Sequence, residues 1–146
     1  MNREIKFRAW DRKEMEMKRV LNISFISWSV TIGNIGDETT ERNSFRNEET
    51  DRFILMQYTG LKDKHGTEIY EGDILRYRPY HNLEYRDRFD IHAVEWGETG
   101  DSDGYSHSRH QEWICGRDSL ADVVDGECEV IGNIYENPKL LEKDGD

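Results

Sequence analysis

Apolar and polar residues alternate along much of this chain, in short runs that end at turn residues. In the run 3–10, Ile5, Phe7 and Ala9 occupy every second position and basic residues lie between them. A period of two is typical of a strand with one face toward a core. By the same criterion, we expect strands at 20–25, 28–32, 54–59, 74–77, 91–96, 112–115 and 127–134. Long amphipathic helices are scarce, so the pattern predicts a mainly β, β-rich α+β fold of several short antiparallel strands.

The stretch 54–77 contains the densest set of local folding signals. Its first strand is expected to stop at Gly60, and the polar turn that follows ends at Gly66, where a positive φ is favourable. A short extended segment leads to a second turn at Asp73. The next strand ends before Pro79, which has no N–H to donate to a ladder.

Other segments interrupt or end the strand pattern. The glycines of 33–36 are expected to end the strand 28–32, and the polar segments 37–51 and 97–111 predict long loops. Residues 120–124 fit either a strand or a helical turn.

The C-terminal segment contains two further signals. Gly132 interrupts the strand pattern of 127–134, which indicates a β-bulge or a close approach of another group. Asn137 and Pro138 are suited to the N-cap and the first position of a helix. We therefore expect a short C-terminal helix.

Composition and charge limit the functional classes. The chain has 146 residues, with 35% hydrophobic and 35% charged residues and a formal net charge of −11, which disfavours non-specific binding to nucleic-acid phosphates. Residues 1–30 hold seven Lys/Arg and four Asp/Glu, whereas residues 97–146 hold four and thirteen. This asymmetry fits self-association between unlike faces or, alternatively, a solvated acidic region.

The two cysteines, Cys115 and Cys128, are too few for a disulfide framework. The N-terminus resembles neither a signal peptide nor a transit peptide, and no apolar run is long enough to span a bilayer. We therefore expect a cytoplasmic protein with reduced thiols and no membrane partner.

Metal sites are suggested only weakly. The segment 101–112 has acids at positions one, three and twelve of a calcium loop but lacks the glycine required at position six. His107, His110, Cys115 and Cys128 are zinc-compatible, but their spacing matches no standard zinc site. We expect no metal and no cofactor.

Catalytic groups are also weakly indicated. Glu68, Glu71 and Asp73 could form a carboxylate cluster, although turn chemistry accounts for Asp73 and solvated side chains for the glutamates. Cys115 paired with His92 or His110 could form a nucleophilic pair on composition alone. No nucleophile elbow or phosphate-binding loop occurs in the sequence, so we expect no catalytic residues.

Aromatic residues next to basic ones suggest a face that could bind a partner or single-stranded nucleic acid, because bases stack on aromatic rings and cations pair with phosphates. The alternative is that these residues form cross-strand pairs and core. The candidates are Lys6, Arg8, Trp10, Arg12, Tyr77, Arg78, Tyr80, Tyr85 and Arg86.

Three motifs together resemble the YopX family of phage and prophage proteins. They are REIKFRAWD at 3–11, MQYTGLKD at 56–63 followed by Gly66 and EIYEGDI at 68–74, and VIGNIYENP at 130–138. The resemblance implies a phage or prophage origin, no established activity and no catalytic residues. It also implies a β-rich fold with a C-terminal small SH3-like barrel portion, and self-assembly.

Together these observations predict a single protein over 1–146, with an N-terminal β portion at 1–60 and a small-barrel portion at 61–146. Our first hypothesis is a non-enzymatic phage or prophage accessory protein of the bacterial cytoplasm that acts as a homo-oligomer or with a protein partner. The alternatives are a nucleic-acid-binding module that uses the basic and aromatic face, and a metal-dependent or thiol enzyme.

Overall fold

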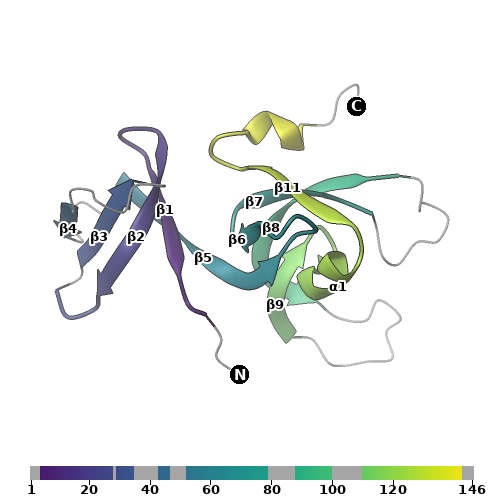
Figure 1. The fold of residues 1–146 in the computed structure, drawn as a ribbon, viewed down its shortest axis with the longest axis horizontal. Coiled ribbons are helices and arrows are strands. Elements are labelled where there is room, and N and C mark those ends of the chain that lie inside the picture. Colours follow the sequence, from purple (N-terminus) through teal and green to yellow (C-terminus); the bar gives the residue numbers. More distant parts are fainter. Residues whose placement is uncertain are drawn as a thin grey trace. The chain divides into compact units, whose positions relative to one another are not determined.

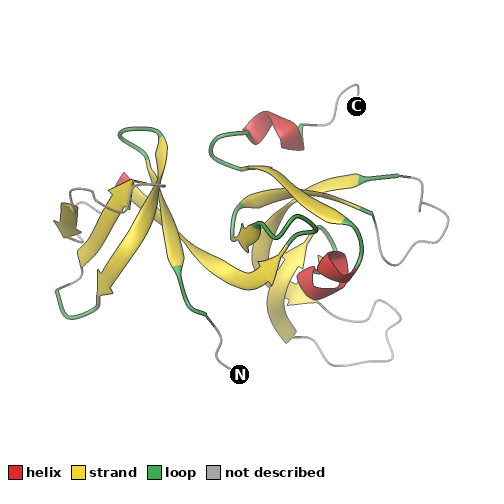
Figure 2. Cartoon of the chain, viewed as in Figure 1, coloured by secondary structure: helices red, strands yellow, loops and turns green. Residues whose placement is uncertain are grey.

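The computed structural model describes residues 4–27, 29–34, 43–46, 52–78, 88–99 and 110–142. Strands make up most of it, with one short α-helix and a terminal 3-10 helix (Figures 1 and 2). The predicted mainly β fold class is therefore confirmed. The chain divides into two compact units, residues 1–58 and residues 59–146. The sequence predicts a boundary between two portions at 60/61. That these portions fold independently stays a prediction.

The first unit is built from antiparallel strands in the order β4-β3-β2-β1-β5. Their bounds are β1 (Phe7–Asp11), β2 (Glu16–Ser24), β3 (Ser29–Asn34), β4 (Asn43–Arg46) and the first part of β5 (Phe53–Lys62). Ala9, Val30, Ile32 and Phe53 form its buried core. Of the residues predicted on the inner face of 3–10, only Ala9 is buried: Phe7 is half-buried and Ile5 is 70% exposed.

The second unit contains a five-stranded antiparallel sheet with the order β10-β9-β8-β7-β11. Its elements, after the end of β5, are β6 (Glu68–Tyr70), β7 (Asp73–Tyr77), β8 (Asp90–Thr99), β9 (His110–Cys115), β10 (Asp118–Ser119), α1 (Leu120–Asp125), β11 (Cys128–Asn133) and η3 (Pro138–Leu141). The buried core is Ile69, Leu75, Tyr77, Val94, Cys115, Leu120, Val123 and Cys128.

Helix α1 decides between the two expectations for 120–124, because these residues are helical. Leu120 and Val123 are spaced by three, so both lie on one face of the helix, and both are fully buried in the core of the second unit.

The free edge of β11 is bonded by the turn that follows β5. The Val130 N–H donates to Asp63 Oδ2 at 2.9 Å, and the Lys64 N–H donates to the Cys128 carbonyl at 3.2 Å. The turn thus replaces a neighbouring strand at this edge. The closed SH3-like barrel expected for this part of the chain stays a prediction.

Three glycines expected to interrupt strands lie inside them. Strand β5 continues through Gly60, whose φ of +87° is accessible to glycine without strain. Strand β3 continues through Gly33 to Asn34, and β8 continues through Gly97 to Thr99. A Cβ at Gly97 would lie 2.5 Å from Ile114 Cδ1, so the glycine makes room for a side chain of β9 rather than ending β8.

The two predicted loops are shorter than expected. Strand β4 lies within 37–51 and pairs with β3 through the register Val30↔Phe45 and Ile32↔Asn43. Strand β9 begins at His110, inside the predicted loop 97–111. Both errors have one cause: backbone pairing can extend a strand into residues that are polar.

Two local predictions are confirmed, and the predicted N-cap at Asn137 is confirmed in position only. Gly66 has a φ of +81°, and the register of β11 shifts between Val130 and Gly132. Asn137 does not cap the terminal helix with its side chain, although Pro138 begins the helix as predicted. Asn137 Oδ1 instead accepts the Asn133 N–H at 3.3 Å.

Candidate interaction surface

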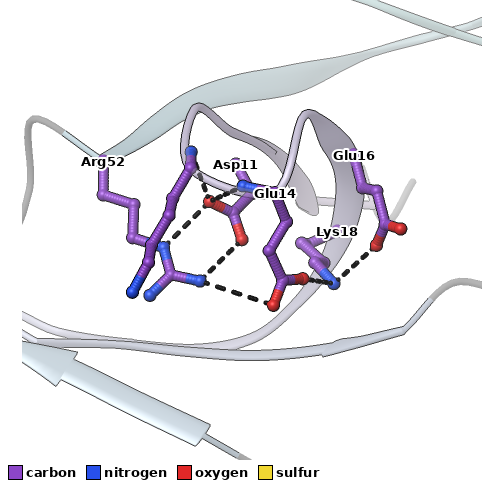
Figure 3. A network of polar contacts seen from close by, with 6 residues as sticks. Asp11, Glu14, Glu16, Lys18 and Arg52 are labelled. Atoms are coloured by element: carbon purple, nitrogen blue, oxygen red, sulfur yellow. Dashed lines mark hydrogen bonds and ion pairs between the residues drawn. The ribbon is translucent and has the colours of Figure 1, made fainter.

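A buried carboxylate organises the turn between β1 and β2 (Figure 3). Asp11 is fully buried, and its Oδ1 accepts the N–H groups of Lys13 at 3.0 Å and Glu14 at 3.3 Å. The Arg52 guanidinium donates to both carboxylate oxygens, at 2.8 and 2.9 Å. These bonds, with that of Arg52 the largest, outweigh burial and lower the pKa of Asp11. Asp11 therefore fixes the turn as an ionised group.

The same network encloses a lysine. Lys18 Nζ lies 2.7 Å from Glu14 Oε2 and 2.9 Å from Glu16 Oε2, which raises the pKa of Lys18, the bond to Glu14 contributing most (Figure 3). Arg52 Nη2 lies 3.9 Å from Glu14 Oε1 and joins the two ion pairs. These cations are thus engaged with carboxylates of their own unit.

The residues predicted to form a basic and aromatic face differ in exposure in the first unit. Lys6 pairs with Glu4 at 3.1 Å and lies over the Tyr58 ring, 4.9 Å from its centre. Arg8 is half-buried and Arg12 is exposed. Trp10 is only 5% exposed, so it cannot offer a ring to a base from the surface. This corrects the placement of Trp10 on the exposed face: Ala9, Trp10 and Asp11 are all buried, so both faces of β1 are covered at its end.

The candidates of the second unit also differ in exposure. Tyr77 is buried, and its hydroxyl donates to the Cys115 carbonyl at 3.3 Å. Burial is the largest of the effects that raise the pKa of Tyr77. Tyr77 is therefore a core residue and not part of an exposed face. Arg78, the next residue, is half-exposed, as expected from the alternation of a strand. Tyr80, Tyr85 and Arg86 lie outside the described residues.

Arg78 belongs to a cluster that the sequence did not reveal. Arg76 Cζ lies 3.7 Å and Arg78 Cζ 4.7 Å from the centre of the Phe89 ring. Glu129 pairs with Arg76 at 3.2 Å, and Glu127 pairs with Arg78 at 2.9 Å. The signal was the matching i, i+2 spacing of Arg76 and Arg78 with Glu127 and Glu129. Arg76 and Glu129 are paired in the β7–β11 register, and just beyond the two strands the Arg78 N–H donates to the Glu127 carbonyl at 3.1 Å. Both arginines are engaged with carboxylates.

The cysteines lack the environment of a nucleophile. Cys115 and Cys128 are buried, and burial raises the pKa of the Cys115 thiol to about 12 and that of Cys128 to about 11. Cys115 Sγ contacts the His92 carbonyl oxygen at 3.5 Å. Nucleophilic cysteines have a lowered pKa. The candidate Cys115–His92 pair is thus a contact between a protonated thiol and a backbone carbonyl, and the side chain of the alternative partner His110 is not described.

Metal-ligand groups do not gather in the described part of the chain. Within 4–27, 29–34, 43–46, 52–78, 88–99 and 110–142, no group of three or more His, Cys, Asp or Glu side chains is placed to hold a metal ion. His107 lies outside these residues, and the side chain of His110 is not described. In the same residues, no helix has the length and apolar character to cross a membrane.

Two acidic residues of 63–73, Asp63 and Asp73, have structural roles. Asp73 is 2% exposed and accepts the Tyr70 N–H at 2.8 Å, which confirms its role in the turn. Asp63 accepts three backbone N–H groups, from His65, Thr67 and Val130, each at 2.9 Å. Burial acts to raise the pKa of Asp63, but these bonds together lower it. Sequence analysis had missed this role, because Val130 is distant in the chain.

Large apolar side chains are exposed at the tip of the β2–β3 hairpin. Phe25 is 75% exposed and Ile26 is 97% exposed. Ser24 Oγ accepts the Ser27 N–H at 3.2 Å, and the hydroxyls of Ser27 and Ser29 lie 2.8 Å apart. We call Phe25 and Ile26 the hairpin tip. The sequence analysis assigned Phe25 to a strand, and the overlooked signal was the absence of charge around it.

A second exposed aromatic residue lies on the β8–β9 pair. Trp96 is 51% exposed and packs edge-on against Trp113, with ring centres 5.0 Å apart. Its indole N–H donates to Gln111 Oε1 at 3.0 Å. Trp96 and Trp113 thus form a cross-strand aromatic pair, which gives Trp96 a structural role despite its exposure.

Comparison with known proteins identifies the family. Curated proteins give no significant match. A solved structure, the crystal structure of protein EF1440 from Enterococcus faecalis, is 29% identical, with a TM-score of 0.61 over 97% of this chain and 100% of that one. The family model described as YopX protein matches residues 6–142. This chain therefore belongs to the YopX family.

Proposed function

We propose that this protein is a phage- or prophage-encoded accessory protein of the bacterial cytoplasm that acts by protein association, as a homo-oligomer, and not by catalysis. One observation carries the proposal. The candidate cations Lys6 and Arg78 are bonded to carboxylates, whereas Phe25 and Ile26 are the most exposed large hydrophobic residues in the described part of the chain. Apolar exposure favours contact with protein, since association buries it.

Charge argues against the nucleic-acid alternative. Residues 1–58 hold ten Lys/Arg and ten Asp/Glu, so the formal charge of −11 comes from residues 59–146. A phosphate approaching Arg78 would also meet Glu127, and one approaching Arg76 would meet Glu129. Neither unit offers a net positive surface by composition.

The groups considered for catalysis have other roles. Cys115 is buried with a raised pKa, and Asp73 holds the turn before β7. In this proposal, residues 59–146 form a small SH3-like barrel that serves as a scaffold, with the Asp63 turn closing its edge. The structural roles of Cys115 and Asp73 leave the proposal without a need for a catalytic group at either position.

Static light scattering of the full chain over a range of concentrations tests the proposal. We expect a mass above the 17.3 kDa of one chain. A mobility-shift assay with single- and double-stranded DNA at low salt provides the second arm, because the phosphate contribution is largest there. We expect no shift. A particle of one chain, or a salt-dependent shift, contradicts the proposal.

A further inference from the structure

The turn of the β2–β3 hairpin does not need the apolar residues at its tip. Hairpin turns favour Asn, Asp and Gly, because these residues adopt the required backbone conformations. Here the polar contacts of the turn are made by serines, with Ser24 accepting the Ser27 N–H and Ser27 contacting Ser29. Phe25 and Ile26 are exposed and absent from the buried core of the unit. In the described residues, neither the turn nor the core therefore requires apolar side chains at positions 25 and 26.

The hairpin tip lies in the middle of an uncharged segment. Residues 20–36 contain no Asp, Glu, Lys, Arg or His, although 35% of the chain is charged. It is the longest run of this kind in the sequence. A surface without cations is poorly suited to anionic lipid or nucleic acid. The partner of the hairpin tip must therefore offer an apolar, uncharged surface.

A second copy of the chain meets this requirement, and charge explains why. Two copies that each carry a net charge of −11 repel one another, so a contact between like surfaces is favoured where charge is absent. In a two-fold contact the same patch faces itself and must be self-complementary. An uncharged apolar patch is complementary to itself, whereas an acidic surface is not.

We infer that the hairpin tip, Phe25 and Ile26, is the contact through which this protein associates with a second copy of itself. The inference rests on the proposed function and names its surface. A stable dimer buries roughly 800 Å² per partner, which two side chains alone do not supply. The uncharged strand segments that flank the tip, 20–24 of β2 and 29–34 of β3, therefore contribute, and association is concentration-dependent.

The main experiment compares two substitutions at the tip with a matched control. Sedimentation velocity is measured over a range of concentrations for the wild type, for Phe25→Ser with Ile26→Ser, and for Ile5→Ser. Ile5 is 70% exposed, so its substitution removes a similar apolar surface elsewhere. We expect the double variant to raise the dimer Kd by about tenfold or more and the control to leave it unchanged. Circular dichroism verifies the fold of each variant.

A cysteine placed at the tip gives an independent measurement. The chain has two cysteines, both buried, so Ile26→Cys adds an accessible thiol to a low background. Residues next to a two-fold axis approach their own copies. Mild oxidation should therefore link Ile26→Cys into a covalent dimer on a non-reducing gel, while Ile5→Cys remains monomeric.

The outcomes separate this inference from the proposed function. A dimer that survives in the double variant, with no cross-link at Ile26→Cys, overturns the assigned surface and leaves self-association intact. A wild type that sediments as a monomer at every concentration overturns both. A monomer that binds phosphatidylcholine vesicles through Phe25 and Ile26 also overturns the inference, in favour of lipid as the occupant.

Discussion

The two units of this protein use buried carboxylates in different ways. In residues 1–58, Asp11 is neutralised by a bidentate bond from Arg52, and Lys18 lies between two glutamates. In residues 59–146, Asp63 accepts three backbone N–H groups. Asp11 combines backbone N–H groups of its own turn, from Lys13 and Glu14, with the side-chain cation of Arg52. Asp63 instead joins the backbone of its turn to the backbone of β11.

Charge differs in parallel with this chemistry. The first unit balances ten basic against ten acidic residues, and its cations Lys18 and Arg52 pair with carboxylates of the same unit. The second unit carries the whole formal charge of −11. Two copies of the first unit do not repel one another by net charge, whereas two copies of the second unit do. Self-association is therefore electrostatically favoured through the first unit over the second.

The largest expected effect is that of Asp63→Ala on the second unit. The substitution removes the shared acceptor of three partly buried hydrogen bonds, from the N–H groups of His65, Thr67 and Val130, and donors that water reaches only in part are costly to leave unpaired. We expect a loss of roughly 3 kcal/mol or more in the free energy of unfolding. Urea unfolding measures it, and hydrogen exchange should be faster at the Val130 amide. Unchanged exchange there would show that Asp63 does not secure β11.

Arg52→Ala should have the next largest effect, confined to the first unit. It leaves the buried Asp11 carboxylate without its cation. Because Arg52 is partly exposed and water can replace it in part, we expect a loss of about 2 kcal/mol. Arg52→Lys is the matched control and should recover part of the loss, since lysine cannot bind both oxygens. Equal stability of the alanine variant and the wild type would argue against the ion pair.

Local sequence patterns predicted the parts of the fold that depend on neighbouring residues. Alternation located β1 and β7, and turn chemistry located Gly66. Gly33 and Gly97 were misjudged, because their role is to accommodate Leu21 and Ile114 from adjacent strands. Such contacts depend on register, which local patterns do not reveal.

The candidate surface was predicted less well for the same reason. Tyr77 and Arg78 are adjacent in sequence and were grouped, yet alternation along the chain separates them, one buried and the other half-exposed. The pairing of Arg78 with Glu127 depends on β7 and β11 lying side by side. Exposure of Phe25 and Ile26 was not evident, because an apolar turn resembles the end of a strand.

Alkaline pH should destabilise the second unit before the first. Burial raises the pKa of Cys115 to about 12, so the unfolded chain loses this proton first and stability falls as pH rises above the ordinary thiol value. One such thiol costs about 1–2 kcal/mol at about pH 10. Lys18 has a raised pKa, so its contribution is present below the ordinary lysine value and is lost only above it.

Urea midpoints at neutral pH and near pH 10 measure this difference. Cys115→Ala is the control variant. It lowers stability by leaving a cavity, but its remaining stability should depend less on pH. A wild type and variant with parallel pH profiles would contradict the assignment to Cys115.

The smallest expected effect is that of Glu127→Gln. Glu127 pairs with Lys64 and Arg78 at the surface, and both bonds lower its pKa, that of Lys64 contributing most. Exposed pairs contribute little to stability, so the urea midpoint should remain within error of the wild type. A clear decrease would make the β7–β11 charge cluster comparable in importance with the Asp11 network.

The most direct test of the account is the mass of the wild-type particle at low and at high salt. Sedimentation velocity at 50 mM and 1 M NaCl, with equal protein concentrations, compares an apolar contact with an ionic one, because salt screens only the second. We predict a particle larger than 17.3 kDa at both concentrations, with association at least as strong at high salt because repulsion between acidic units is screened. A 17.3 kDa particle at high salt would contradict the account.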